Sequence, residues 1–145
     1  MVTTDFTITT DFDGNVPRVT LPNPEFLNYL GEEKFRALVS RHYDLLTESV
    51  VKNLFPTHPR ALEAAKSKSA DFFIQLMGGP EYYKQNRGEP MMRKRHLPFK
   101  IDMDARIVWL QCYQIALNEL ENVPAHLLQS YWNYLEKFSL WMINS

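Results

Sequence analysis

Residues 93–101 read Arg-Lys-Arg-His-Leu-Pro-Phe-Lys-Ile, and Trp109 follows thirteen positions after His96. Residues 91–96 are expected to form a short helix that Pro98 cuts off, because the residue before a proline is disfavoured in helical conformation. His96 is therefore expected at a helix end, after two arginines and before a Pro-Phe pair that sets the direction of the chain.

A histidine in this setting has two interpretations. A rigidly held imidazole with cationic neighbours and apolar rings suits an axial ligand of haem iron, and the arginines would meet the porphyrin carboxylates. An ordinary histidine at a helix end fits the spacing as well, and spacing alone favours that plainer interpretation.

Helical periodicity surrounds this stretch on both sides. Before it, apolar spacing predicts a short helix from Phe26 to Gly31, a helix from about Glu32 that stops before Pro56, and a helix over 60–77 that ends at Gly78-Gly79-Pro80. After it, helices are expected over 102–120 and beyond Pro124. The fold class is therefore all-α, with a long, poorly helical connection over 81–90, and connections of that length are usually functional.

The first two dozen residues differ from the rest. Residues 7–10 are β-prone, residues 13–15 form a turn signal, and Pro22-Asn23-Pro24 closes the segment. We expect residues 1–24 to be an extension, either a small hairpin or an extended arm, attached to a helical domain over 25–145. The extension is expected to be dispensable for binding a cofactor.

Composition narrows the class of protein. The 145 residues are 45% hydrophobic and 23% charged, with a formal net charge of −1, so nothing in the overall charge suggests nucleic acid or an anionic membrane. The sole cysteine, Cys112, excludes an internal disulfide and a cysteine-rich zinc module. No apolar run is long enough to span a membrane, and the expected compartment is the cytoplasm.

Other catalytic patterns are missing from the sequence. It has no phosphate-binding glycine loop and no His-Glu-x-x-His, and its four histidines lack the spacing of a multi-histidine metal site. His42 falls on a buried helix face and is expected to be a hydrogen-bonded core histidine. Asp102 and Asp104 are expected to cap a helix rather than to act as an acid–base pair.

A set of motifs resembles the truncated haemoglobins of group II. These motifs are Gly78-Gly79-Pro80, Tyr83, Arg87-Gly88, Pro90, the run from Arg93 to Ile101, and Trp109-Leu110-Gln111-Cys112. The resemblance covers roughly residues 31–120 and implies a two-over-two helical sandwich, a shortened globin fold that carries one b-type haem.

The resemblance also implies residue roles. His96 matches the proximal ligand of the iron. The distal side is matched by Tyr43, Phe55, Ala65, Ser69 and Trp109, of which Ser69 replaces the usual apolar residue and Phe55 replaces the tyrosine of many members. Contacts with the haem are implied for Phe72, Phe73, Phe99, Tyr83, Arg93 and Arg95.

Two functions remain open at this stage. The first is binding of O₂ or another diatomic gas (NO or CO) at a pentacoordinate haem iron, in the oxygen-binding and transport class. The second is a haem redox enzyme, acting on peroxide or detoxifying nitric oxide. The ligand-binding function is preferred over an enzyme, a helical interaction domain without cofactor is a third option, and a monomer or homodimer is expected.

Overall fold

The structure, a computed structural model, describes residues 4–145. Its elements are α1 (Glu25–Thr47), η1 (Lys52–Leu54), α2 (Pro59–Leu76), α3 (Tyr82–Arg87), α4 (Met92–His96), α5 (Met103–Asn118) and α6 (Ala125–Met142). Within these described residues there is no strand, and no helix is long and apolar enough to cross a membrane. The all-α prediction is confirmed.

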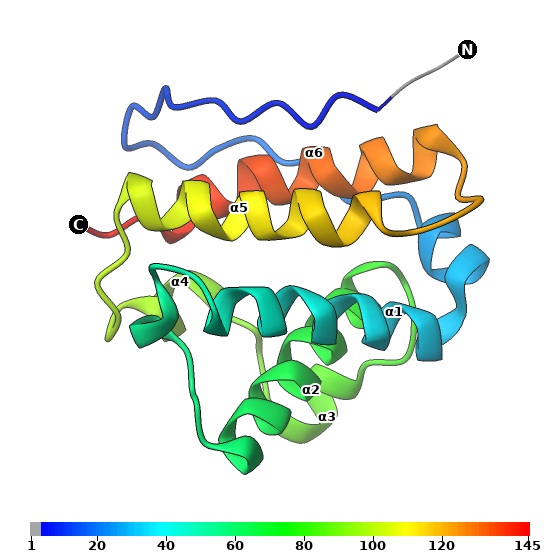
Figure 1. The fold of residues 1–145 in the computed structure, drawn as a ribbon, viewed down its shortest axis with the longest axis horizontal. Coiled ribbons are helices and arrows are strands. Elements are labelled where there is room, and N and C mark those ends of the chain that lie inside the picture. Colours follow the sequence, from blue (N-terminus) through cyan, green and yellow to red (C-terminus); the bar gives the residue numbers. More distant parts are fainter. Residues whose placement is uncertain (1–3) are drawn as a thin grey trace.

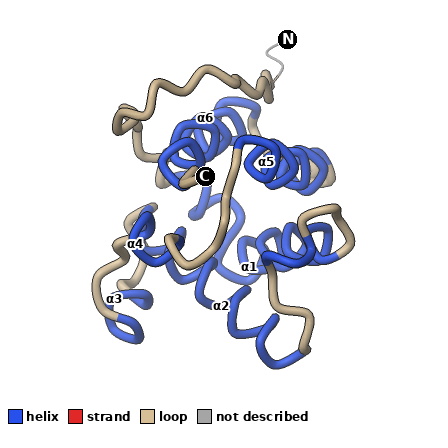
Figure 2. The backbone as a smooth tube through the Cα atoms, turned by 90° about the vertical axis from the view of Figure 1, so that its left-hand side faces the viewer, coloured by secondary structure: helices blue, strands red, loops and turns tan. Residues whose placement is uncertain are grey.

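The four long helices form two layers. In Figure 1, α5 and α6 lie side by side above α1 and α2, and the end-on view of Figure 2 shows the same two pairs. Aromatic side chains fill the space between the layers: the Tyr131 ring lies 4.9 Å from Phe26 and 5.6 Å from Phe73, measured between centroids. Burying each such ring contributes about 1.5–3 kcal/mol, so this interface is a major source of stability.

Helix ends follow the local sequence. Asp102 caps α5, since its Oδ1 accepts a hydrogen bond of 2.8 Å from the amide of Ala105, which confirms the expected capping role. His58 caps α2 through Nδ1, and Pro59 occupies the first turn. Gly31 has φ +80°, so α1 is kinked at the position where two separate helices were predicted.

The connection before His96 is more ordered than the sequence predicts. Residues 82–87 of the segment expected to be poorly helical form α3, so that part of the prediction is wrong. Buried Tyr83 and an ion pair of 2.7 Å between Arg87 and Asp71 of α2 hold this short helix in place. Tertiary contacts therefore stabilise α3, which has no periodic apolar stripe of its own.

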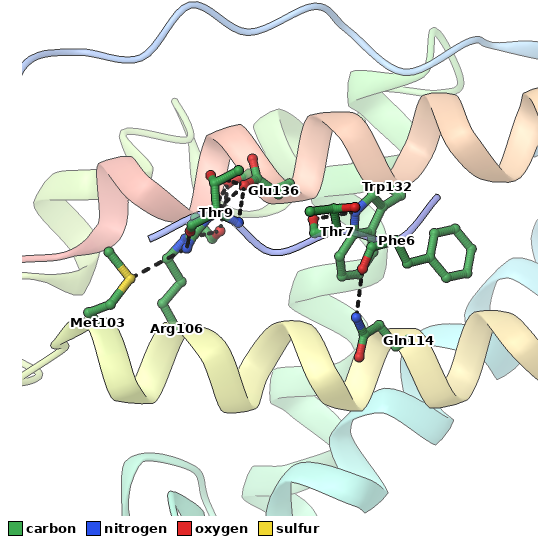
Figure 3. A network of polar contacts seen from close by, with 9 residues as sticks. Phe6, Thr7, Thr9, Met103, Arg106, Gln114, Trp132 and Glu136 are labelled. Atoms are coloured by element: carbon green, nitrogen blue, oxygen red, sulfur yellow. Dashed lines mark hydrogen bonds and ion pairs between the residues drawn. The ribbon is translucent and has the colours of Figure 1, made fainter. Parts of the chain in front are cut away.

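The described part of the extension, residues 4–23, forms neither helix nor strand. It runs along the α5–α6 layer and doubles back, as an extended arm (Figure 1). The Trp132 indole donates to the Thr7 carbonyl over 3.2 Å, and the Gln114 amide donates to the Phe6 carbonyl over 2.7 Å (Figure 3). Side chains of α5 and α6 thus donate hydrogen bonds to backbone carbonyls of the arm that a neighbouring strand would pair with in a β-sheet.

Candidate functional site

A cavity of about 480 Å³ lies among α1, α2, α4, α5 and α6. This volume is within the roughly 300–1,000 Å³ that cofactor pockets occupy. Most of its lining residues are apolar, and polar side chains are in the minority. The predicted residues that line it are Tyr43, Phe55, Ala65, Ser69, Phe72, Phe73, Arg95, His96, Phe99 and Trp109.

Among the described residues, His96 is the only histidine or cysteine in the cavity wall. Its Nδ1 lies 2.6 Å from the carbonyl oxygen of Met92, one turn earlier in α4. Because a carbonyl only accepts, Nδ1 carries the proton and Nε2 keeps a free lone pair. Burial lowers the pKa of His96, and nearby Lys68 lowers it further against the opposing effect of the Met92 bond. The neutral tautomer that binds a metal through Nε2 is therefore favoured.

The loop after His96 is held by the C-terminal residues. The Asn144 side chain donates to the carbonyls of His96, over 3.2 Å, and Phe99, over 2.8 Å, and it accepts a bond of 2.9 Å from the amide of Ile101. One amide side chain thus fixes three backbone groups of this loop. The His96 end of α4 is anchored to the end of α6 by these bonds.

Tyr43 and Trp109 supply the two aromatic donors of the cavity wall. Tyr43 comes from α1, and its ring packs edge-on against Phe55 at 5.7 Å. Burial raises the pKa of Tyr43, and an interaction with the Ser69 hydroxyl partly offsets that rise. Tyr43 is therefore a neutral donor. Trp109 comes from α5, so the donors reach the cavity from different layers.

Three cationic side chains, those of Lys68, Arg87 and Arg95, line one part of the cavity. Burial lowers the pKa of Lys68, and so does the charge of Arg95 and Arg87. Arg95 donates to the carbonyls of Arg87 and Glu89, over 2.9 and 2.8 Å, but its buried Nε has no hydrogen-bond partner within residues 4–145. Arg87 is paired with Asp71, whereas Lys68 and Arg95 form no ion pair within residues 4–145, so the cluster presents net positive charge to the cavity, which suits an anionic group.

Two predicted contacts fall outside the cavity wall. Tyr83 is fully buried below Arg87 and Arg95, whose guanidinium carbons lie 5.7 and 5.4 Å from its ring centroid, and its hydroxyl has no partner in the described part of the chain. Arg93 points to the end of α6, where it donates to the carbonyls of Trp141 and Ile143. The structure brings the other ten predicted residues together in the cavity wall. Tyr83 lies behind that wall in contact with Arg95 and Phe72, and Arg93 points away from it.

Arg106 forms a buried polar link between the cavity wall and the arm (Figure 3). Its guanidinium pairs with Glu136 at 3.2 Å and donates to Ser139 over 2.9 Å and to the Thr9 carbonyl over 2.5 Å. Burial lowers the pKa of Arg106, and the charge of Glu136 opposes that effect. The guanidinium is thus fully engaged and acts as structural support.

Comparison with known proteins identifies the family. The sequence model of the bacterial-like globin family matches residues 26–144. The chain is 30% identical over 116 residues to group 2 truncated hemoglobin YjbI of Bacillus subtilis strain 168, covering 79% of this chain and 85% of that protein. Phosphate-bound Hell's gate globin IV is 39% identical, with a TM-score of 0.86 over 96% of this chain and 86% of that one. The truncated oxygen-avid haemoglobin from Bacillus subtilis is 29% identical, with a TM-score of 0.75 over 82% of this chain and 98% of that one. The chain belongs to the group II truncated haemoglobins.

Membership confirms the two-over-two globin fold, and proteins of this family typically bind haem and diatomic ligands. The residues of this truncated haemoglobin fit a haem. His96 offers a free Nε2 at the cavity, and the unpartnered Nε of Arg95 beside two further cations suits the haem carboxylates. Apolar rings of Phe72, Phe73 and Phe99 provide walls for a flat macrocycle.

Several residues of the site were not predicted from the sequence. Lys68, Arg87 and Met92 line the cavity, and Asn144 fixes the loop after His96. The motif Arg87-Gly88 does not indicate that Arg87 lines the cavity, and Asn144 is a polar residue near the end of the chain with no local pattern. A helical wheel of α2 would have placed Lys68 near Ala65 and Phe72, at spacings of three and four, and this signal was available.

Proposed function

We propose that this truncated haemoglobin holds one b-type haem through Nε2 of His96 and binds O₂ or another diatomic ligand on the opposite face. The observation that carries the proposal is the bond of 2.6 Å from His96 Nδ1 to the Met92 carbonyl, which leaves Nε2 free in a cavity shared with Tyr43 and Trp109. Residues 4–145 contain no cluster of three or more histidine, cysteine, aspartate or glutamate side chains that could hold a metal ion, so His96 would be the single protein ligand.

A haem held by His96 would supply an iron that binds a diatomic gas, and O₂ bound there would carry partial negative charge. The chain's own groups would then act on that charge. The indole N–H of Trp109 and the hydroxyl of Tyr43 can each donate one hydrogen bond in a largely apolar cavity. Lys68, Arg87 and Arg95 would pair with the haem carboxylates and so fix the orientation of the group.

Covalent attachment of the haem is not supported by the sequence. Attachment through thioethers uses a Cys-x-x-Cys-His motif, whereas the only cysteine here, Cys112, is buried on α5 and does not line the cavity. Burial raises the pKa of the Cys112 thiol, so it stays protonated and unreactive at neutral pH. The haem would therefore be held without a thioether bond, as is the b-type haem that the resemblance to the group II truncated haemoglobins implies.

A second candidate function is redox chemistry on the same haem, with peroxide or nitric oxide as the co-substrate. The two donors favour it, since strong hydrogen bonds slow the release of O₂, and slow release suits a redox enzyme better than bulk delivery. The cavity also supports this candidate because its wall, as far as the structure describes it, contains no carboxylate that would repel an anionic product.

The test has two steps. The first is the absorption spectrum of the purified or hemin-loaded protein, where a Soret band and a five-coordinate ferrous spectrum are expected. The second compares O₂ dissociation by stopped flow with turnover of peroxide and of nitric oxide. Reversible O₂ binding without turnover supports the ligand-binding function, turnover supports the redox candidate, and the absence of a Soret band overturns both.

A further inference from the structure

His42 is a fully buried histidine that the proposed function does not use. It lies on α1 next to Tyr43 and is 1% exposed. Its Nε2 lies 3.0 Å from the carbonyl oxygen of Trp109 on α5, and it therefore donates a hydrogen bond across the two layers. The sequence prediction of a hydrogen-bonded core histidine is confirmed.

The His42 ring also limits where the Trp109 indole can go. The two rings meet edge to face, with centroids 5.1 Å apart and planes at 90°. The His42 ring also stacks on the ring of Tyr113, with centroids 3.6 Å apart. The Tyr113 ring in turn packs against the Trp109 ring, with centroids 5.1 Å apart. Trp109 is thus fixed by a bond to its backbone and by two rings against its side chain.

The position of Tyr113 is in turn fixed from α6. Its hydroxyl shares a hydrogen bond of 3.0 Å with the hydroxyl of Tyr131, and both side chains are fully buried. Tyr113, which stacks on His42, is therefore held by the core between the two layers. A rotation of His42 would require this core to move, which densely packed interiors resist.

The charge state of His42 keeps this arrangement constant. Burial lowers the pKa of His42 to about 3, against the opposing effect of the bond to Trp109. The imidazole is therefore neutral under ordinary conditions. Its single N–H donates to the Trp109 carbonyl, so the side chain of His42 holds one fixed orientation.

We propose that His42 positions the indole N–H of Trp109 toward the ligand and thereby sets the rate at which the ligand leaves. The proposal rests on the proposed function, because it requires Trp109 to face a ligand in the cavity. His42 itself does not line the cavity, so it is a positioning residue that acts through Trp109.

The test is a double-mutant cycle on the hemin-loaded protein. His42→Phe keeps a ring of similar size without the donor, and His42→Gln keeps a donor without the ring. The O₂ dissociation rate is measured for each, alone and combined with Trp109→Phe, and CO dissociation serves as the control. His42→Leu repeats the loss of the donor in case the Phe variant does not fold.

The expected result is specific to Trp109. Because the His42→Phe variant loses one neutral hydrogen bond, it should release O₂ roughly three- to ten-fold faster than the original chain. Its rate of CO release should stay within about two-fold of the original rate. His42→Gln should recover most of the original O₂ rate. In the Trp109→Phe background, where the indole N–H is gone, His42→Phe should have no further effect on O₂ release.

A second readout is independent of ligand binding. The indole ¹H–¹⁵N signal of Trp109 in the apoprotein should shift or broaden in His42→Phe and return toward its original position in His42→Gln. An unchanged indole signal with unchanged O₂ release overturns the proposal. Equal acceleration with and without Trp109 also overturns it, because His42 would then act by general loosening. A Trp109→Phe variant that releases O₂ at the original rate would instead contradict the ligand contact in the proposed function, and the positioning role toward ligand falls with it.

Discussion

At the scale of single residues, Trp109 and Tyr43 are the aromatic donors of the cavity wall. A hydrogen bond to a partly charged acceptor in such a site contributes about 1.5–3 kcal/mol. Trp109→Phe or Tyr43→Phe should therefore accelerate O₂ dissociation by roughly ten- to a hundred-fold. Stopped-flow measurement of the single and double variants checks this expectation.

Carbon monoxide is the matched control for these variants, because it accepts hydrogen bonds poorly. Equal acceleration for both gases would show that the rings act only as a steric gate. Ser69 interacts with Tyr43 and lines the cavity, so its hydroxyl can replace a lost donor. Ser69→Ala is therefore added to the double variant, and unchanged O₂ rates in that triple variant would contradict the donor role.

Lys68 tests the cationic part of the cavity. It lines the wall beside Arg87 and Arg95, whereas Lys94 is exposed on α4 and does not line it. Because Lys68 is also exposed, its pairing with a haem carboxylate is worth at most about 1 kcal/mol. Lys68→Gln should speed haem loss to an excess of apomyoglobin by roughly two- to five-fold. Lys94→Gln should lose haem at the original rate, and equal rates for the two variants would contradict the assignment.

The sequence predicts residues best where the chain itself fixes the side chain. His96 could be found because Pro98 ends its helix and the surrounding motif is contiguous. Arg93 was expected at the haem carboxylates, but the structure directs it to the carbonyls at the end of α6. Nothing in the order Arg-Lys-Arg distinguishes Arg93 from Arg95, since the choice depends on how α4 sits against α6.

At the scale of elements, the arm is a part of the structure with a defined polar role. Thr9 accepts from Arg106 through its carbonyl and donates to Glu136 through its amide, over 2.9 Å. A chain that starts at Asn23 would leave Arg106 short of one acceptor, at a cost of about 1–3 kcal/mol. We expect this chain to bind haem with unchanged stoichiometry but to melt roughly 3–10 °C lower.

Calorimetry of both chains, together with a hemin titration, checks the role of the arm. Thr9→Val is the matched smaller change, because it removes the hydroxyl bond to Glu136 and keeps the carbonyl that serves Arg106. It should lower the melting temperature by less than the truncation does. Identical melting temperatures of the truncated and full chains would contradict the structural role of the arm. Failure of the truncated chain to bind hemin would contradict the expectation that the arm is dispensable for haem binding.

The elements that the sequence predicts less well are those held by partners distant in the chain. The long helices follow from their apolar periodicity, and the kink at Gly31 was visible as a helix end. By contrast, α3 depends on the pairing of Arg87 with Asp71, and the arm depends on side chains of α5 and α6 such as Gln114. Such long-range pairings leave no periodic signal in the local sequence.

At the scale of the whole molecule, the buried neutral side chain of His42 makes the free energy of unfolding depend on pH. The pKa of His42 falls from 6.5 to about 3 on burial. Between these values the unfolded state binds a proton that the folded state does not, so stability is lost as pH falls below about 6.5. For His42 alone, the free energy of unfolding should drop by about 2 kcal/mol from pH 7 to pH 5.

Urea unfolding of the apoprotein at both pH values measures this drop. His42→Gln cannot titrate, so its loss of stability between pH 7 and pH 5 should be smaller than that of the original chain by about that amount. His126 is exposed, and His126→Gln is the matched control that should leave the pH dependence unchanged. Equal pH dependence in all three proteins would contradict a neutral buried His42.

The central claim is that His96 ligates haem iron, and titration of the apoprotein with hemin tests it most directly. The original chain should bind one equivalent and develop a Soret band with an imidazole-type ferrous spectrum. His96→Ala should retain haem weakly or not at all, because the iron loses its protein ligand, whereas His126→Ala should match the original chain. An unchanged Soret band and imidazole-type ferrous spectrum in His96→Ala would contradict the account.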